Sequence, residues 1–210
     1  MAQITLNVTK DASIKSDTVS TNYNDTVLRV GSDFYTGFWR TLLHFDLSSL
    51  AGKNVLSAIL RMCQGAFPDT PATLPFSVYC ITADWGENTV TWANQPSFSE
   101  TAKVDLSINT TSQAWREFNI TALIQDIVNN SRTYYGLLLR QPGTESNALK
   151  YFFSSEQAGY EPQLIVDCTG ELKARVAGVW KETEQYVRVA GVWRPASAFG
   201  RAGGVWRQGI

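Results

Sequence analysis

The chain has 210 residues, with 18 basic and 19 acidic side chains that leave a formal net charge of −1 at pH 7. This length allows one hydrophobic core and a small additional segment, and the balanced charge argues against nucleic acid as a partner, because no basic field is available to bind phosphate. No apolar segment is long enough to span a bilayer, so no membrane contact is predicted.

From residue 1 to about residue 168 the chain repeats one pattern, in which apolar or alternating runs are separated by Gly, Pro, Asn and Asp. Runs of this length are typical of strands, and they cover residues 4–8, 27–30, 42–47, 56–62, 76–80, 136–140 and 164–168. We predict an all-β sandwich over residues 1–169. The first run follows Met-Ala-Gln without a secretory signal, so we expect either a chain that stays in the cytosol or one whose leader was removed.

One helix is expected within the strands. Thr121 is the predicted cap, and the apolar stripe that follows consists of Leu123, Ile124, Ile127 and Val128. We expect this helix to close one end of the sandwich. Three prolines between Ala66 and Pro75 predict a surface loop, and Gly170 marks the boundary to the last segment.

The last forty residues contain three copies of one short repeat, the Gly-Val-Trp phrase. Its glycines and tryptophans recur every thirteen residues, at Gly178, Gly191 and Gly204 and at Trp180, Trp193 and Trp206. The period is too short for a helical repeat, so each copy is predicted to be two short strands about an Ala-Gly or Gly-Gly corner. Residues 170–210 are therefore expected to form three hairpins, joined in a six-strand meander.

Such a ribbon has little interior and needs a surface to cover it. Identical Trp-bearing strands favour a homo-oligomer whose ribbons bury one another's indoles, with packing on the chain's own first domain as the alternative. Residues 171–210 carry seven basic and three acidic side chains, against 11 basic and 16 acidic before them. These charges suit an acidic surface, and they equally suit a solvated strand edge that prevents aggregation.

Catalytic chemistry has little support. His44 and Asp46 share a strand face, but no nucleophile elbow and no second histidine accompany them, so His44 is interpreted as a satisfied polar residue and Asp46 as a turn cap. Asp84 and Glu87 lie three apart in one loop, which suits loop bracing or a bound cation better than paired hydrolytic acids. We predict that the chain is not an enzyme.

Metal and cofactor sites are not predicted either. The aspartates Asp11, Asp17, Asp25 and Asp33 offer oxygen ligands near the first turns, but no Asp-x-Asp-x-Asp loop is present, so turn chemistry is favoured over calcium. The cysteines Cys63, Cys80 and Cys168 fall in strand-like runs without CxxC spacing. They are predicted to be buried thiols in a reducing compartment.

Several motifs occur in the order of a known family. They include Asp11-Ala-Ser-Ile, Leu28-Arg-Val-Gly, Arg40-Thr-Leu-Leu-His-Phe-Asp-Leu-Ser-Ser-Leu, Asp84-Trp-Gly-Glu-Asn-Thr-Val-Thr-Trp-Ala-Asn-Gln-Pro, Tyr135-Gly-Leu-Leu-Leu-Arg and Phe153-Ser-Ser-Glu. Over residues 3–168 the chain resembles the DNRLRE domain, which is similar to carbohydrate-binding module family 96. The resemblance implies a jelly-roll-like sandwich that serves as a non-catalytic module, with Trp85 and Trp92 both buried in a strapped loop.

Glycan binding requires exposed aromatic faces and planar polar partners for hydroxyl groups. The most aromatic stretch outside the repeats is Phe34 to Trp39, and the candidate platform consists of Tyr23, Tyr35, Trp39 and Arg40. For Trp39 a role in the core explains the pattern equally well. Arg140 is interpreted as a salt-bridge partner at a strand end.

The Gly-Val-Trp phrase resembles short repeats of phage virion proteins, particularly tail and neck components. The two resemblances together imply a virion structural and adhesion protein, assembled in the host cytoplasm. Its sandwich would contact host polysaccharide, and its repeats would hold it to other copies and other virion proteins. The alternative is an extracellular bacterial carbohydrate-binding module protein without a catalytic domain.

Overall fold

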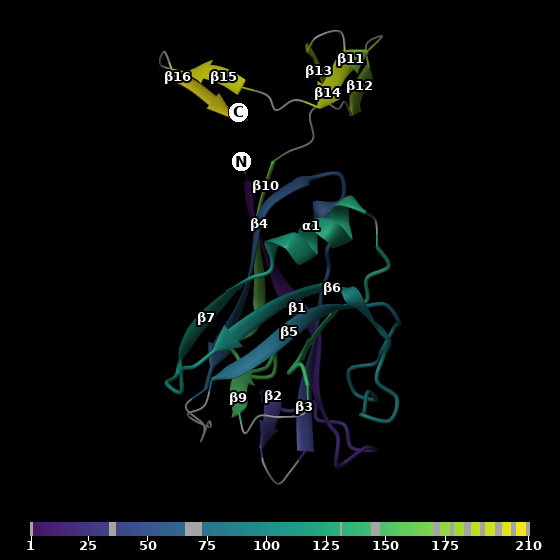
Figure 1. The fold of residues 1–210 in the computed structure, drawn as a ribbon, viewed down its shortest axis with the longest axis vertical. Coiled ribbons are helices and arrows are strands. Elements are labelled where there is room, and N and C mark those ends of the chain that lie inside the picture. Colours follow the sequence, from purple (N-terminus) through teal and green to yellow (C-terminus); the bar gives the residue numbers. More distant parts are fainter. Residues whose placement is uncertain are drawn as a thin grey trace.

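A computed structural model describes residues 2–33, 37–65, 73–130, 132–143 and 148–169, and the short strands at 173–176, 179–182, 186–189, 192–195, 199–202 and 205–208. The first part contains β1 (Ala2–Lys15), β2 (Val27–Asp33), β3 (Gly37–Phe45), η1 (Ser48–Leu50), β4 (Asn54–Gln64), β5 (Leu74–Ile81), β6 (Phe98–Ile108), β7 (Ala114–Asn119), α1 (Thr121–Asn129), β8 (Leu137–Arg140), β9 (Ala148–Phe153) and β10 (Gln163–Thr169). The predicted all-β class with one short α-helix is confirmed for the described residues (Figure 1).

The strands of residues 2–169 form one ten-stranded antiparallel sheet. Its hydrogen-bonded neighbours run β1-β10-β4-β9-β2-β3-β8-β5-β6, and β7 pairs with β4. β1 pairs twice, through residues 2–7 with β10 and through residues 8–15 with β3, with an irregularity between Val8 and Lys10 at the change of partner. β1, β10, β4, β9, β2 and β3 therefore make a closed, barrel-like circuit within the sheet.

Two apolar clusters lie on opposite faces of β3. Leu43 belongs to the main core, with Leu60 of β4 and Val166 of β10, whereas its neighbour Leu42 belongs to a second cluster. The division follows from the alternation of side chains along a strand. The second cluster includes Trp85 of the loop at residues 82–97, which covers this outer face of β1, β3, β5 and β8.

The helix carries the predicted stripe, and its beginning differs from the prediction. Leu123, Ile124 and Ile127 are buried in the main core, and α1 packs against β4, β5 and β6 (Figure 1). Thr121 is not the cap, because its Oγ1 accepts a hydrogen bond from the N–H of Ala58 at 2.9 Å. The first turn is instead held by Asn119 Oδ1, which accepts from the N–H of Thr121 at 3.0 Å.

Local details of three predicted elements also differ. Leu56 is 38 % exposed while Val55 is fully buried, because the register of β4 against β10 shifts beside Ser57. β5 already begins at Leu74, so Pro75 lies in a strand and not in the predicted loop, most of which lies outside the described residues. The predicted buried thiols are confirmed at the three cysteines.

The last segment contains three separate two-stranded antiparallel sheets: β11 (Lys173–Val176) with β12 (Val179–Glu182), β13 (Tyr186–Val189) with β14 (Val192–Pro195), and β15 (Phe199–Ala202) with β16 (Val205–Gln208). Each register sets an arginine opposite a tryptophan, at Arg175 and Trp180, Arg188 and Trp193, and Arg201 and Trp206. The described strands of one hairpin do not pair with those of the next, so the predicted six-strand meander is wrong for them. Gly170, Gly178, Gly191 and Gly204 lie outside the described residues. Within the described part of the chain, α1 falls well short of the length that a membrane-crossing helix needs.

Candidate functional site

The structure brings some of the predicted platform together. Trp39 and Arg40 are successive residues of β3, and Tyr23 lies beside Trp39 with ring centroids 4.7 Å apart at 67°. Tyr35 lies outside the described residues. Trp39 is only 8 % exposed, because Tyr23 packs edge-on against it and the cations of Lys15 and Arg29 lie 5.1 Å and 4.9 Å from its centroid. Neighbouring side chains of the protein therefore cover most of the Trp39 ring.

A cavity of ≈ 250 Å³ lies next to Trp39. It is lined by Phe38, Trp39, Arg40, Trp92, Arg140, Gln141 and Gly143. These residues come from β3, from the loop at residues 82–97, and from the end of β8 and the residues that follow it. Aromatic rings, guanidinium groups and an amide are the groups that bind sugar rings, hydroxyls and carboxylates in concave sites.

Arg40 and Trp92 form one wall of this cavity. The Arg40 guanidinium lies 4.3 Å from the centroid of Trp92 and donates a hydrogen bond to Gln95 Oε1. Gln95 in turn donates to the carbonyl oxygen of Trp92 at 2.9 Å. Burial, and then the positive charge of Arg140, lower the pKa of Arg40 to about 10. Arg40 therefore stays protonated at neutral pH and contributes a partly desolvated positive charge.

Arg140 supplies the second guanidinium. It lies over the rings of Tyr79 and Phe98, 5.1 Å and 5.0 Å from their centroids, and 3.7 Å from Glu100 Oε1. Its Nε is buried without a hydrogen-bond partner. Gln141, which follows, is 7 % exposed. The cavity lining therefore combines two cationic groups with an amide side chain.

Sequence reasoning missed the contribution of Trp92 and Arg140. Trp92 is half-buried, not fully buried as predicted, whereas Trp85 is buried at 6 % exposure. Arg140 reaches the cavity because Thr41 pairs with Leu139 in an antiparallel ladder, so Arg40, which precedes Thr41, comes level with Arg140, which follows Leu139. That juxtaposition depends on strand order, and the sequence carries no local signal for it.

His44 and Asp46, which were predicted to have polar roles, each have a hydrogen-bond partner. His44 Nδ1 lies 2.6 Å from Thr9 Oγ1, and burial, followed by the charge of Lys10, lowers its pKa. Asp46 Oδ1 accepts from the N–H of Ser48, which confirms the turn cap.

Asp84 and Glu87 brace their loop separately. Asp84 accepts from the N–H of Trp85 and pairs with Lys10 Nζ at 3.3 Å. Glu87 Oε1 accepts from the N–H of Asp11 at 2.8 Å. The two acids therefore contact different partners, and this arrangement does not place them as a facing pair.

A comparison with family models finds one match, to carbohydrate-binding module family 96, over residues 2–168. The matched range contains β1 to β9 and nearly all of β10, together with every residue that lines the cavity, and it leaves the hairpin segment outside. No curated protein matches the chain.

Proposed function

The chain belongs to carbohydrate-binding module family 96, and we propose on this premise that its cavity binds a polysaccharide that carries carboxylate groups. The observation that carries the proposal is the pair of guanidinium groups, Arg40 and Arg140, which line one cavity together with a half-buried Trp92. The ring offers apolar surface to a sugar, and the arginines offer planar donors to a carboxylate. No reaction is assigned, because the family is one of binding modules.

We expect Trp92→Ala to weaken binding to a polyuronate roughly 30-fold, since an aromatic anchor in an interface contributes about 2 kcal/mol. Arg140→Gln should also weaken the binding of polyuronate at low salt. The binding that remains should depend less on salt concentration, because one positive charge has been removed. Binding is measured by calorimetry, after a polysaccharide array that contains polyuronates and neutral glucans.

Trp115→Ala is the matched control for this experiment. Trp115 is also half-buried, with the Arg61 guanidinium 4.2 Å from its centroid, but it lies on β7 and does not line the cavity. The Trp115→Ala variant should bind polyuronate as the unaltered chain does. Equal losses in the two tryptophan variants, or stronger binding to neutral glucans, would contradict the proposal.

The second part of the proposal concerns residues 170–210, which we assign to assembly. Three phrases at a thirteen-residue period, and hairpins with the same arginine–tryptophan register, support three equivalent contact units. We propose a homo-oligomeric virion protein of a bacteriophage, assembled in the host cytoplasm, whose module contacts host surface polysaccharide. The resemblance of the Gly-Val-Trp phrase to repeats of virion proteins supports this placement.

Deletion of residues 170–210 is expected to convert a multimer into a monomer that still binds polysaccharide, because the cavity lies wholly within residues 2–168. Light scattering measures the mass, and a full chain with Trp180, Trp193 and Trp206 replaced by alanine should behave like the deletion. A full chain that is itself monomeric, with quencher-accessible tryptophans, would refute the assembly role.

The alternative is an extracellular bacterial carbohydrate-binding protein without a catalytic domain, and the family match, which concerns the module alone, is compatible with it. The neighbouring genes separate the two. Capsid, portal or tail genes support the virion protein, and polysaccharide lyase genes support the bacterial module.

A further inference from the structure

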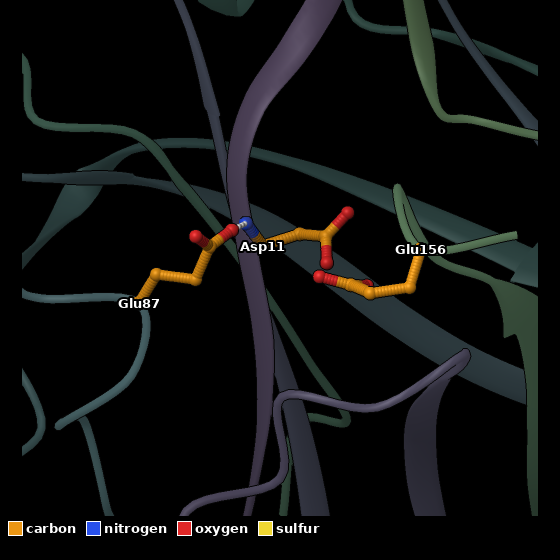
Figure 2. Close-up of side chains that lie close together, drawn as sticks. All are labelled: Asp11, Glu87 and Glu156. Atoms are coloured by element: carbon orange, nitrogen blue, oxygen red, sulfur yellow. Dashed lines mark hydrogen bonds between the residues drawn. The ribbon is translucent and has the colours of Figure 1, made fainter. Parts of the chain in front are cut away.

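Three carboxylates from distant parts of the chain meet outside the cavity. Asp11 lies on β1, Glu87 on the loop at residues 82–97, and Glu156 on the turn between β9 and β10. One oxygen atom of each lies within 4.8 Å of the others. Figure 2 shows Glu87 bonded to the backbone N–H of Asp11 and the Asp11 carboxylate facing that of Glu156.

No salt bridge neutralises this cluster among the described residues. Asp11 Oδ2 accepts from the N–H of Ser155 at 2.8 Å, and Glu87 accepts from the N–H of Asp11, but none of the three acids forms a salt bridge in the described part of the chain. Negative groups this close repel one another unless a proton or a cation lies between them.

Unpaired buried oxygens provide independent evidence for a ligand. Asp11 is fully buried, and its Oδ1 has no hydrogen-bond donor. Asn24 Oδ1 is also buried without a donor, while its Nδ2 donates at 2.8 Å to Asn88, the residue after Glu87. Buried oxygens in proteins almost always have a partner, so the unpaired Asp11 Oδ1 indicates that a lone-pair acceptor is missing at the cluster.

The electrostatics of Asp11 agree with this geometry. Burial raises its pKa to about 7, and the negative charges of Glu156 and Glu87 act in the same direction. A bound cation would reverse the repulsion and allow all three carboxylates to remain ionised.

We propose that Asp11, Glu87 and Glu156 bind a calcium ion. Calcium takes oxygen ligands at about 2.3–2.6 Å, so two of its ligands are at most about 4.6–5.2 Å apart, which this cluster already satisfies. Magnesium, at about 2.0–2.1 Å, requires a tighter and near-octahedral shell that the cluster would have to contract to form.

The ion would tie together three segments that are far apart in the sequence. Glu87 belongs to the loop that carries Trp92, and Asn22 holds the same loop through hydrogen bonds from its Nδ2 to the carbonyl oxygens of Glu87 and Val90. Calcium is therefore a structural ligand that fixes this loop on β1. The role is independent of any polysaccharide.

The test uses the full chain, freed of metal with a chelator and then titrated with CaCl₂ while Tm and binding heat are measured. At a hundredfold excess of calcium over its Kd, Tm should rise by roughly 5–10 °C. MgCl₂ at the same concentrations should give a much smaller shift. The absence of both a shift and binding heat with calcium would overturn the site, and an equal response to magnesium would overturn its assignment to calcium.

Two variants and a matched control assign the response to these residues. Asp11→Asn should abolish the calcium shift yet leave the metal-free chain at least as stable, because it removes an uncompensated buried charge. Glu156→Gln changes an exposed side chain and should lower calcium affinity at least tenfold with an unchanged metal-free Tm. Asp84→Asn, an exposed acid of the same loop paired with Lys10, should respond to calcium as the unaltered chain does. A loss in Asp84→Asn equal to that in Glu156→Gln would refute the site.

Trp92→Ala should keep the full calcium shift. Failure of the polysaccharide proposal is therefore distinguishable from failure of the calcium proposal.

Discussion

Replacement of Gly31 by alanine is expected to destabilise the fold severely. Gly31 lies in β2, opposite Trp39 of β3 and Leu149 of β9, with φ at +113°. A Cβ atom here would overlap the carbonyl oxygen of Ala148 and lie 3.0 Å from Leu74 Cδ1. The carbonyl belongs to β9 and cannot move without breaking the ladder with β2.

Two costs therefore add in Gly31→Ala. The backbone conformation alone costs about 1–3 kcal/mol for a residue with a side chain, and the overlap with β9 raises the total above roughly 4 kcal/mol. A domain of this size loses about 2–4 °C of Tm for each kcal/mol, so we expect a fall of at least roughly 8 °C or a largely insoluble product. Thermal unfolding followed by circular dichroism measures the loss.

Gly159→Ala separates the overlap from the backbone strain. Gly159 also has a positive φ, +87°, but a Cβ atom would meet nothing within 4 Å. It should lose only about 1 kcal/mol. If both variants lost the same stability, the close approach of β2 and β9 would not be the cause.

Phe152→Ala is expected to destabilise the fold by about 3–5 kcal/mol, the cost of removing a fully buried phenylalanine. Phe152 is 1 % exposed and packs edge-on against Phe118 with centroids 6.1 Å apart. Phe118 packs in turn on Phe76 at 5.2 Å, so the three rings join β9, β7 and β5 across the main core. Phe152 also pairs with Gln64, where β9 meets β4 and closes the circuit.

The neighbouring ring is the control for this prediction. Phe153 is half-buried and lies 4.9 Å from Tyr160, on the opposite side of β9. Phe153→Ala should cost less than half as much as Phe152→Ala in denaturant unfolding, because it removes less buried surface. If the two variants lost the same stability, the main core would not lie on the face of β9 that carries Phe152.

The strands that could be predicted are those whose side chains alternate in polarity. β10 shows this directly, since Leu164, Val166 and Cys168 are buried between partly exposed residues. β9 lacked the signal because Lys150 is fully buried and donates from its Nζ to the carbonyl oxygen of Thr110 at 3.1 Å. A buried lysine interrupts an apolar pattern although the strand is central. β6 did alternate, at Ala102, Val104, Leu106 and Ile108, and the prediction omitted it.

The candidate sites were less predictable than the strands. The aromatic stretch indicated Trp39, but its burial follows from strand pairing: β2 pairs with β3 and carries Arg29, and Tyr23 is bridged to β1, the other neighbour of β3. The four aspartates considered for calcium included Asp11 alone of the cluster, because Glu87 and Glu156 are 76 and 145 positions from it along the chain. No spacing rule connects such distant acids.

The sequence by itself determined the all-β class, the helix stripe and the extent of the family module, because alternation, apolar periodicity and ordered motifs are local properties of the chain. It also determined the thirteen-residue period of the terminal phrases. Only the tertiary structure decided that β1 serves two partners, that Arg40 and Arg140 come level beside Trp92, and that three acids surround one point. These arrangements depend on which strands pair and in what register, and pairing is set by the closure of the whole core.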